Sequence, residues 1–327
     1  MSARRPGLAG LAAGVRSGDA LSLARAISLL EDGGADGREL LRSLHGDGAP
    51  AHTVGVTGPP GVGKSTLISA LVAEARARSL SVGVVAVDPT SPFSDGALLG
   101  DRIRLEEHFL DPGVFIRSMG SRGRSGGLAE ATLQTLLLLG AAGREVVFLE
   151  TVGSGQGEVS VRSTTDTVVL VLMPGSGDSV QALKAGIMEI PDLIALNKRD
   201  LPGVERAARE LRQVLSLGPG GPPPILLTDA LAREGTAELW LAIERHRARA
   251  EADGSLARRR ADNLVAEVMT LASARARRYL ENAVASDPEL AALLAEVRLG
   301  RLDPLSGVEE ILRRVFQIGN QDSPHTR

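Results

Sequence analysis

The sequence predicts an α/β fold, a doubly wound and mostly parallel sheet flanked by helical extensions at both ends. Between Thr53 and His246, short β-rich runs alternate with helical ones, as in repeated strand and helix units. The runs are almost continuously apolar, which is typical of parallel strands covered by helices on both faces. The strand candidates are HTVGVT, SVGVVAVD, VFIRSM, EVVFLET, TVVLVLM, LIALN and PILLT.

Three parts are expected along the chain. Residues 1–50 carry apolar side chains at helical spacing and predict a helical N-terminal arm. Residues 51–248 hold the sheet domain, and residues 249–327 are arginine-rich and helical without a strand pattern. Because this last part has enough apolar positions, it is expected to cap the sheet or to pair with a second copy as a dimerisation extension.

Composition limits the possible partners and compartment. A net charge of -3, with basic residues spread along the chain, gives no reason to expect nucleic acid, and Arg258–Arg260 is interpreted as a solvated helix face. The chain has no cysteine, which excludes disulfides and thiolate ligands and fits a reducing compartment. Its five histidines lack ligand spacing and are interpreted as surface or packed residues. No signal peptide or membrane span is expected, so the predicted location is cytoplasmic.

A phosphate-binding loop, GPPGVGKS, follows the first strand candidate and precedes a helix. Glycines in such a loop let successive backbone N–H groups point inward, and the helix adds its positive end. Lys64 is expected to reach the β- and γ-phosphates, and the Ser65 hydroxyl to bind Mg²⁺. The predicted nucleotide-binding residues here are Gly58, Pro59, Pro60, Gly61, Val62, Gly63, Lys64, Ser65 and Thr66.

A second motif, Asn197-Lys198-Arg199-Asp200, follows the strand LIAL and indicates the base. The Asp200 carboxylate can accept hydrogen bonds from N1–H and the exocyclic amine of guanine, whereas adenine offers neither donor there. GTP is therefore predicted over ATP. Asn197, Lys198 and Asp200 are the predicted base-side residues, with Thr228 and Ala230 after the strand PILL as further candidates.

Metal binding and γ-phosphate sensing need carboxylates at strand ends. Asp88 and Glu150 end apolar strands, and Asp101 lies in a turn-rich segment between them. These three, with Lys64, are the predicted catalytic residues, and with Ser65 they are the predicted metal ligands. Gly153, in the motif ETVG, is placed where its N–H could contact the γ-phosphate.

Ser154 follows Gly153 where small signalling GTPases place a glutamine that orients water, and the nearest amide is Gln156. Slow intrinsic hydrolysis is therefore predicted. A partner or a second subunit is expected to complete the site, as an arginine finger does elsewhere.

Together these motifs closely resemble the MeaB/ArgK family. The resemblance also rests on the segments VDPTSPFSDGALLGDRIRL, IRSMGSRGRSGGLAEAT and PGSGDSVQALKAGIMEIPDLIALNKRD, and it spans most of the chain. It implies a homodimeric P-loop GTPase of the signal-recognition/MinD/BioD-like (SIMIBI) class that uses GTP/GDP and Mg²⁺. It further implies docking on methylmalonyl-CoA mutase or a related adenosylcobalamin-dependent acyl-CoA mutase, whose cofactor loading it gates and which it protects or reactivates.

The same resemblance assigns residues. Lys64 and Ser65 would hold phosphate and Mg²⁺, Asp88, Asp101 and Glu150 would surround the metal, and Asn197, Lys198 and Asp200 would read guanine. The segment 174–186 matches the switch that communicates with the mutase, so Gln181 and Lys184 are candidates for coupling. The sequence departs from the family pattern at Asp95, Arg124-Ser125 and Thr228-Asp229, the first two within switch regions.

Alternative functions remain open at this point. A nickel or other metal-insertion GTPase shares the fold, but the lack of cysteine and of a histidine cluster argues against it. An ATP-dependent kinase of a transport protein would need adenine preference, which Asp200 disfavours. A GTP-binding scaffold without turnover is the third possibility.

Overall fold

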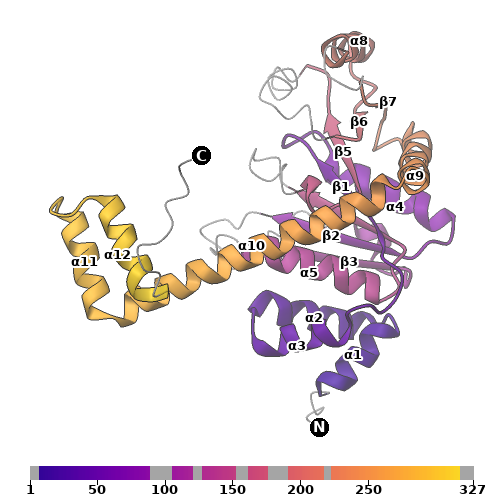
Figure 1. Cartoon of the computed structure of the whole chain (residues 1–327). Helices are drawn as coiled ribbons and strands as arrows, with labels where there is room; N and C mark the ends of the chain where they lie inside the picture. The colour runs from indigo at the N-terminus through magenta and orange to yellow at the C-terminus, as the bar shows by residue number, and fades with distance from the viewer. Residues whose placement is uncertain are drawn as a thin grey trace. The chain divides into compact units, whose positions relative to one another are not determined.

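Seven parallel strands form one sheet within the part of the chain that the structure describes (Figure 1). The computed structural model describes residues 7–88, 105–120, 127–151, 161–175, 191–216 and 222–316. The strand order is β3-β2-β4-β1-β5-β6-β7, so β4 lies between β1 and β2, and β5, β6 and β7 follow one another on the other side of β1. The strands are β1 His52–Thr57, β2 Val82–Asp88, β3 Val114–Gly120, β4 Val146–Thr151, β5 Thr167–Leu172, β6 Leu193–Leu196 and β7 Ile225–Leu227. The predicted strands and the doubly wound parallel sheet are confirmed.

Alternating side chains of the buried strands form a core on each face of the sheet. On one face Phe148 of β4 packs against Trp240 of α9, with ring centroids 6.4 Å apart. On the other face Val147 and Leu149 of the same strand pack into a second core. Helices α4 (Lys64–Ala77) and α9 (Thr236–Ala252) cover the first face, and α5 (Gly127–Ala141) and α8 (Val204–Leu215) cover the second.

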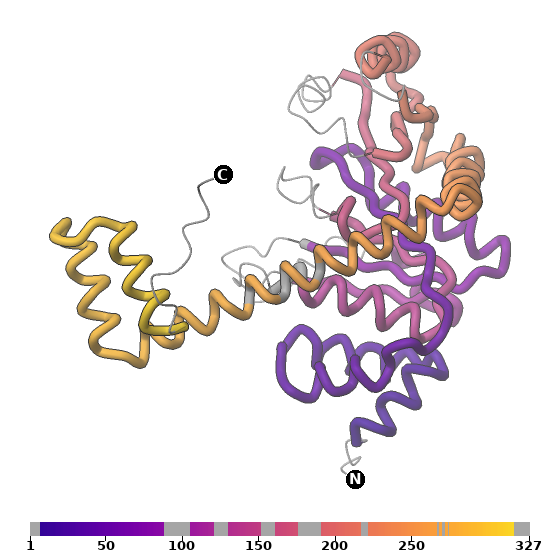
Figure 2. The backbone as a smooth tube through the Cα atoms, viewed as in Figure 1, coloured from indigo at the N-terminus to yellow at the C-terminus, as the bar shows by residue number. Residues whose placement is uncertain are grey.

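The N-terminal arm contains helices α1 (Leu8–Arg16), α2 (Ala20–Asp32) and α3 (Ala35–Ser43). The Asp19 carboxylate caps α2 by accepting a hydrogen bond from Ser22 N at 2.8 Å. Figures 1 and 2 show these indigo helices against α5, with which α1 and α2 share a buried apolar cluster. The arm is also tied to the sheet, because Arg117 of β3 forms a 2.5 Å ion pair with Glu31 of α2.

The C-terminal part begins with α10 (Ser255–Ser286) and continues with α11 (Pro288–Arg298) and α12 (Pro304–Phe316). The chain divides into two compact units, Met1–Glu267 and Val268–Arg327. In the second unit α11 packs against α12, and the rings of Tyr279 and Phe316 have centroids 6.0 Å apart. In the described ranges there is no helix that combines the length and the apolar character of a membrane span.

The interpretation of Arg258–Arg260 as a solvated face is wrong for two of its three members. Arg258 is exposed and donates to the Asp253 carbonyl at 3.4 Å. Arg259 and Arg260 instead form short ion pairs with Asp192 and Asp166, whose side chains are only 10% and 5% exposed. The physical reason is that the acidic partners lie in loops before β6 and β5, far from the arginines in sequence.

Candidate nucleotide-binding site

The predicted phosphate loop occupies residues 58–63, between the end of β1 and the start of α4. Its three glycines have backbone conformations that other residues adopt at a cost, with φ of 139° at Gly58, 78° at Gly61 and 95° at Gly63. A Cβ on Gly58 would collide with the Val171 carbonyl oxygen, and one on Gly63 would lie 2.6 Å from Asn197 Nδ2. The loop is therefore a tight turn that requires glycine at both positions.

Lys64 and Ser65 form the first turn of α4, and both side chains are buried. Lys64 Nζ donates to the carbonyls of Gly58 at 2.8 Å and Pro59 at 3.1 Å, so the ammonium lies across the loop. A lysine in this position can exchange carbonyl oxygens for phosphate oxygens, which are stronger partners for an ammonium group.

Ser65 and Glu150, both predicted as metal ligands, are brought into contact. Ser65 Oγ donates to Glu150 Oε1 at 2.6 Å, and both side chains are buried. The contact follows from the sheet order, because β4, which carries Glu150, pairs directly with β1, which leads into the loop. A hydroxyl and a carboxylate are the hard oxygen ligands that Mg²⁺ accepts, so this pair fits that ion.

Asn197 joins three segments at the carboxyl edge of the sheet. Its Nδ2 donates to the Val62 carbonyl at 2.8 Å, and its Oδ1 accepts from Ala230 N at 3.0 Å and from Thr228 Oγ1 at 3.2 Å. The side chain is buried. Asn197 thus braces the phosphate loop against the turn after β7.

The remaining residues of the predicted base motif lie in the turn that follows. Lys198 has a φ of 59° and donates from Nζ to the Gly61 carbonyl at 2.9 Å. The N–H of Arg199 donates to the Thr228 carbonyl at 3.0 Å, which holds this turn beside the one after β7. Asp200 is exposed, so its carboxylate is accessible to a ligand.

A group that the sequence did not reveal connects α4 to the turn after β7. Glu107 accepts a hydrogen bond from Ser69 Oγ of α4 at 2.6 Å and one from Arg233 Nη2 at 2.5 Å. The hydrogen bond from Ser69, followed by the charges of Arg233 and His108, holds the pKa of Glu107 below its usual value despite partial burial. No local sequence signal could have found this group, because its members are separated by long stretches of chain.

Several predicted site residues cannot be placed. Asp101, Gly153, Gln181 and Lys184 lie outside the described residues. Asp88 ends β2 beside β4, but its side chain is not among those described. Of the predicted acidic set, the structure therefore places the Glu150 side chain.

Comparison with known proteins identifies the family. The family model described as methylmalonyl Co-A mutase-associated GTPase MeaB matches residues 23–285. A Pyrococcus abyssi protein named for GTPase activity is 43% identical over 311 residues, covering 93% of this chain and 96% of that protein. The GTPase ArgK of Escherichia coli is 35% identical, with 70% of this chain and 72% of that protein covered.

A mouse relative and a solved structure extend the comparison. The mouse protein, a mitochondrial methylmalonic aciduria type A homolog, is 32% identical, and the match covers 76% of this chain and 65% of that protein. A crystal structure described as an LAO/AO transport system kinase has a TM-score of 0.71 and 27% identity, covering 97% of this chain and 100% of that chain. On this family match and these relatives, the chain belongs to the MeaB family and is a GTPase.

Proposed function

We propose that this GTPase docks on an adenosylcobalamin-dependent acyl-CoA mutase of the methylmalonyl-CoA mutase type, gates loading of its cofactor, and protects or reactivates it. The observation that carries the proposal is the family match over residues 23–285, whose description names a methylmalonyl-CoA mutase-associated GTPase. The name of the mouse relative, which refers to methylmalonic aciduria, supports the same class of partner.

The phosphate loop holds the GTP polyphosphate in this proposal. The tight glycine turns at Gly58 and Gly63 support it, because they bring backbone N–H groups to the start of α4, where the helix dipole favours an anion. Lys64 then moves its hydrogen bonds from the loop carbonyls to phosphate oxygens. Gly153, predicted to donate to the γ-phosphate, would complete this set.

Ser65 and Glu150 are the residues that would hold Mg²⁺, together with Asp88 and Asp101 on the sequence argument. When bound, the ion neutralises negative charge on the β- and γ-phosphates. The 2.6 Å contact supports this role, because Glu150 accepts the hydrogen bond from the Ser65 hydroxyl, whose oxygen lone pairs then remain available for a cation.

Asp200 reads guanine in this proposal, and Asn197, Lys198, Thr228 and Ala230 shape the base pocket. The exposed Asp200 carboxylate is available to the guanine N1–H and amine. Asn197 makes buried hydrogen bonds to Val62 of the phosphate loop and to Thr228 and Ala230 in the turn after β7. These bonds support a base pocket that is held at a fixed distance from the phosphate loop.

A second copy of this chain is the proposed partner of α10. A group of neighbouring apolar side chains on this helix is more than half exposed, and the spacing of its members places them along one side of it. Such a stripe is costly to leave in water and suits a helix-to-helix dimer contact. The residues are Leu264, Val265, Val268 and Met269.

Sedimentation of the purified protein tests the dimer. Val268→Asp with Met269→Asp should shift the dimer toward monomer, whereas Arg275→Ala, an exposed polar position on the same helix, should not. A wild-type protein that sediments as a monomer at micromolar concentration would remove the dimer from the proposal.

The mutase role is tested by GTP hydrolysis with and without purified methylmalonyl-CoA mutase, in its apo and cobalamin-loaded forms. The mutase should form a complex and raise the hydrolysis rate by roughly tenfold or more, since partner-supplied groups in other GTPases give larger effects. Lys64→Ala should lose hydrolysis under both conditions. If the mutase neither forms a complex nor stimulates hydrolysis, the mutase role is removed while the GTPase activity stands. Hydrolysis retained by Lys64→Ala would instead overturn the phosphate-loop assignment.

A further inference from the structure

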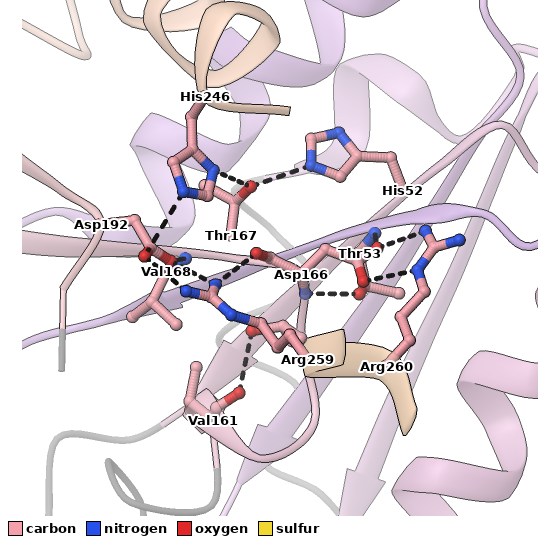
Figure 3. A network of polar contacts seen from close by, with 11 residues as sticks. His52, Thr53, Val161, Asp166, Thr167, Val168, Asp192, His246, Arg259 and Arg260 are labelled. Atoms are coloured by element: carbon pink, nitrogen blue, oxygen red, sulfur yellow. Dashed lines mark hydrogen bonds and ion pairs between the residues drawn. The ribbon is translucent and has the colours of Figure 1, made fainter. Parts of the chain in front are cut away.

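A cluster of partly buried ion pairs lies beside the starts of β5 and β6 (Figure 3), whereas the phosphate loop follows the end of β1. Arg259 of α10 binds both carboxylate oxygens of Asp192, at 2.8 and 2.9 Å. The next residue, Arg260, binds both oxygens of Asp166, at 2.7 and 2.8 Å. We call these four residues the arginine clamp. All of them belong to the first compact unit, Met1–Glu267.

Each aspartate of the arginine clamp also joins two neighbouring strands. Asp166, just before β5, accepts from Thr53 N of β1 at 2.9 Å and donates from its own N–H to the Thr53 carbonyl at 3.0 Å. Asp192, just before β6, accepts from Val168 N of β5 at 2.9 Å. Asp166 and Asp192 therefore hold the starts of β1, β5 and β6 together. Their two carboxylates are in turn bound by two consecutive arginines of α10.

A second chain of hydrogen bonds runs beside the arginine clamp. Thr167 Oγ1 lies 2.9 Å from both His52 Nε2 and His246 Nδ1, and His246 Nε2 lies 3.4 Å from Asp192 Oδ1. Because a carboxylate only accepts, His246 presents Nε2–H to Asp192, and with neutral rings its Nδ1 accepts from the Thr167 hydroxyl. His52 then donates to Thr167. The chain links β1, β5 and α9 to the same aspartate that Arg259 holds.

The charges in the arginine clamp depend on one another. Burial alone would raise the pKa of Asp166, but hydrogen bonds from Arg260 and its charge outweigh burial and lower it. For Asp192, hydrogen bonds from Arg259 and His246 likewise outweigh burial and lower the pKa. Loss of an arginine would leave a buried carboxylate without its counter-ion, which is a strongly unfavourable arrangement. The strand starts and α10 are thus expected to move together.

The same three strands carry the candidate nucleotide site at their other ends. The phosphate loop follows β1, residues 173–175 follow β5, and Asn197 follows β6. These strands are only four to six residues long and pair directly with one another, so they form a short packed path between the two edges, the kind of element that can carry coupling between sites. Arg259 and Arg260 are consecutive on α10, so rotation of this helix would pull on both aspartates.

We infer that Arg259 and Arg260 are positioning residues that couple α10 to the nucleotide site, so that the arginine clamp has a different free energy in the GDP and GTP states. The inference rests on the proposed nucleotide site. It gives a route by which bound nucleotide is communicated to the C-terminal helix, and by reciprocity a route by which whatever binds α10 changes nucleotide preference.

The test is the ratio of the affinities for GDP and for a non-hydrolysable GTP analogue, measured on the full chain by titration calorimetry. In Arg259→Gln with Arg260→Gln the ratio should change by about fivefold or more, the lower end of common coupling effects. Arg258→Gln, the exposed neighbour, should leave the ratio unchanged. A purely structural role would lower stability or weaken both nucleotides alike and leave the ratio as in wild type, which would overturn the inference.

Hydrogen exchange of α10 amides around residues 256–266 is the second readout. The difference in exchange between the two nucleotide states should be present in wild type and in Arg258→Gln, and lost in the double variant. If the double variant does not fold, as judged by circular dichroism, Arg260→Lys replaces it, because lysine keeps the charge but cannot bind both oxygens of Asp166 in parallel. A wild-type protein that binds both nucleotides without any difference in exchange would overturn the coupling alone. One that binds neither nucleotide would overturn the proposed site and the coupling together.

Discussion

Ser65 Oγ donates a 2.6 Å hydrogen bond to Oε1 of Glu150, from the first turn of α4 to the penultimate residue of β4. Both side chains are buried, so water does not compete strongly for this contact. The donated proton fixes the orientation of the hydroxyl and keeps its lone pairs available. The pair thus has the arrangement that the proposed Mg²⁺ site requires.

Glu150→Gln should lower Mg²⁺-dependent GTP hydrolysis by at least about 10- to 100-fold, the range that follows from disturbing a metal site. Glutamine keeps the shape and can still accept from Ser65, but it removes the negative charge that favours a divalent cation. Hydrolysis measured against Mg²⁺ concentration provides the check, with Glu145→Gln, an exposed position before the same strand, as the control. An unchanged Mg²⁺ dependence would show that Glu150 is not a ligand.

Asp200→Asn should reduce the preference for GTP over ATP by roughly 10- to 100-fold, because hydrogen bonds to a charged acceptor contribute about 1.5–3 kcal/mol. The new amide N–H₂ can donate to the carbonyl that xanthine carries in place of the guanine amine, so binding of XTP should improve. Competition between the three nucleotides measures both effects, and Glu205→Gln, exposed on α8, serves as the control. Unaltered selectivity would place the base elsewhere.

The sequence was sufficient for the strands and for the phosphate loop because their signals are local. Continuous apolar runs predicted each strand, and the loop motif placed Lys64 and Ser65 at the start of a helix, where the structure has them. The contact of Ser65 with Glu150 depended in addition on β4 lying beside β1, a strand order that periodicity alone does not give.

Contacts between distant segments were beyond the sequence. Arg259 and Asp192 are 67 residues apart in sequence, and Arg260 and Asp166 are 94 apart. The charge pattern within the helix therefore predicted solvent-exposed arginines, whereas the structure places Arg259 and Arg260 in ion pairs. Asn197 is predicted to lie on the base side of the site, and the structure adds that its amide joins two loops by hydrogen bonds to Val62 and Ala230. The motif did not reveal these contacts, because both partners lie more than 30 residues away in sequence.

Gly58→Ala should destabilise the fold and weaken GDP binding together. Its φ of 139° disfavours any side chain, and a Cβ would meet the Val171 carbonyl, so a loss of about 1–3 kcal/mol in unfolding free energy is expected. Gly143→Ala is the control, because Gly143 also has a positive φ, of 73°, but has open space where the alanine methyl group would lie. The loss of unfolding free energy in this variant should therefore be smaller than in Gly58→Ala. Urea unfolding and GDP titration check both. Equal losses for the two variants would mean that the loop has room for a side chain.

His52 should make the protein less stable as the pH falls from about 6.5 toward about 4. Burial, more than the nearby charges, lowers the pKa of this ring to about 4; Asp166 opposes the shift, whereas Arg247, Arg260 and His246 add to it. The unfolded chain therefore takes up a proton below about pH 6.5 while the folded protein does not, and the unfolding free energy decreases by up to about 3 kcal/mol across this window.

The check is urea unfolding of wild type and His52→Gln at several pH values between about 7 and about 4.5. Glutamine can still donate to Thr167 Oγ1, the 2.9 Å partner of His52 Nε2, but it does not titrate. The difference in unfolding free energy between the two proteins should therefore change steadily over this range, in the direction that favours the variant at low pH. If the difference in unfolding free energy between the two proteins stays constant with pH, His52 is protonated as easily in the folded protein as in the unfolded chain, and its burial does not disfavour the charged ring.

Asp166 and Asp192 keep their charges to lower pH in the folded state than in the unfolded chain. Their contribution to stability is therefore lost only below this pH window and does not mask the effect of His52.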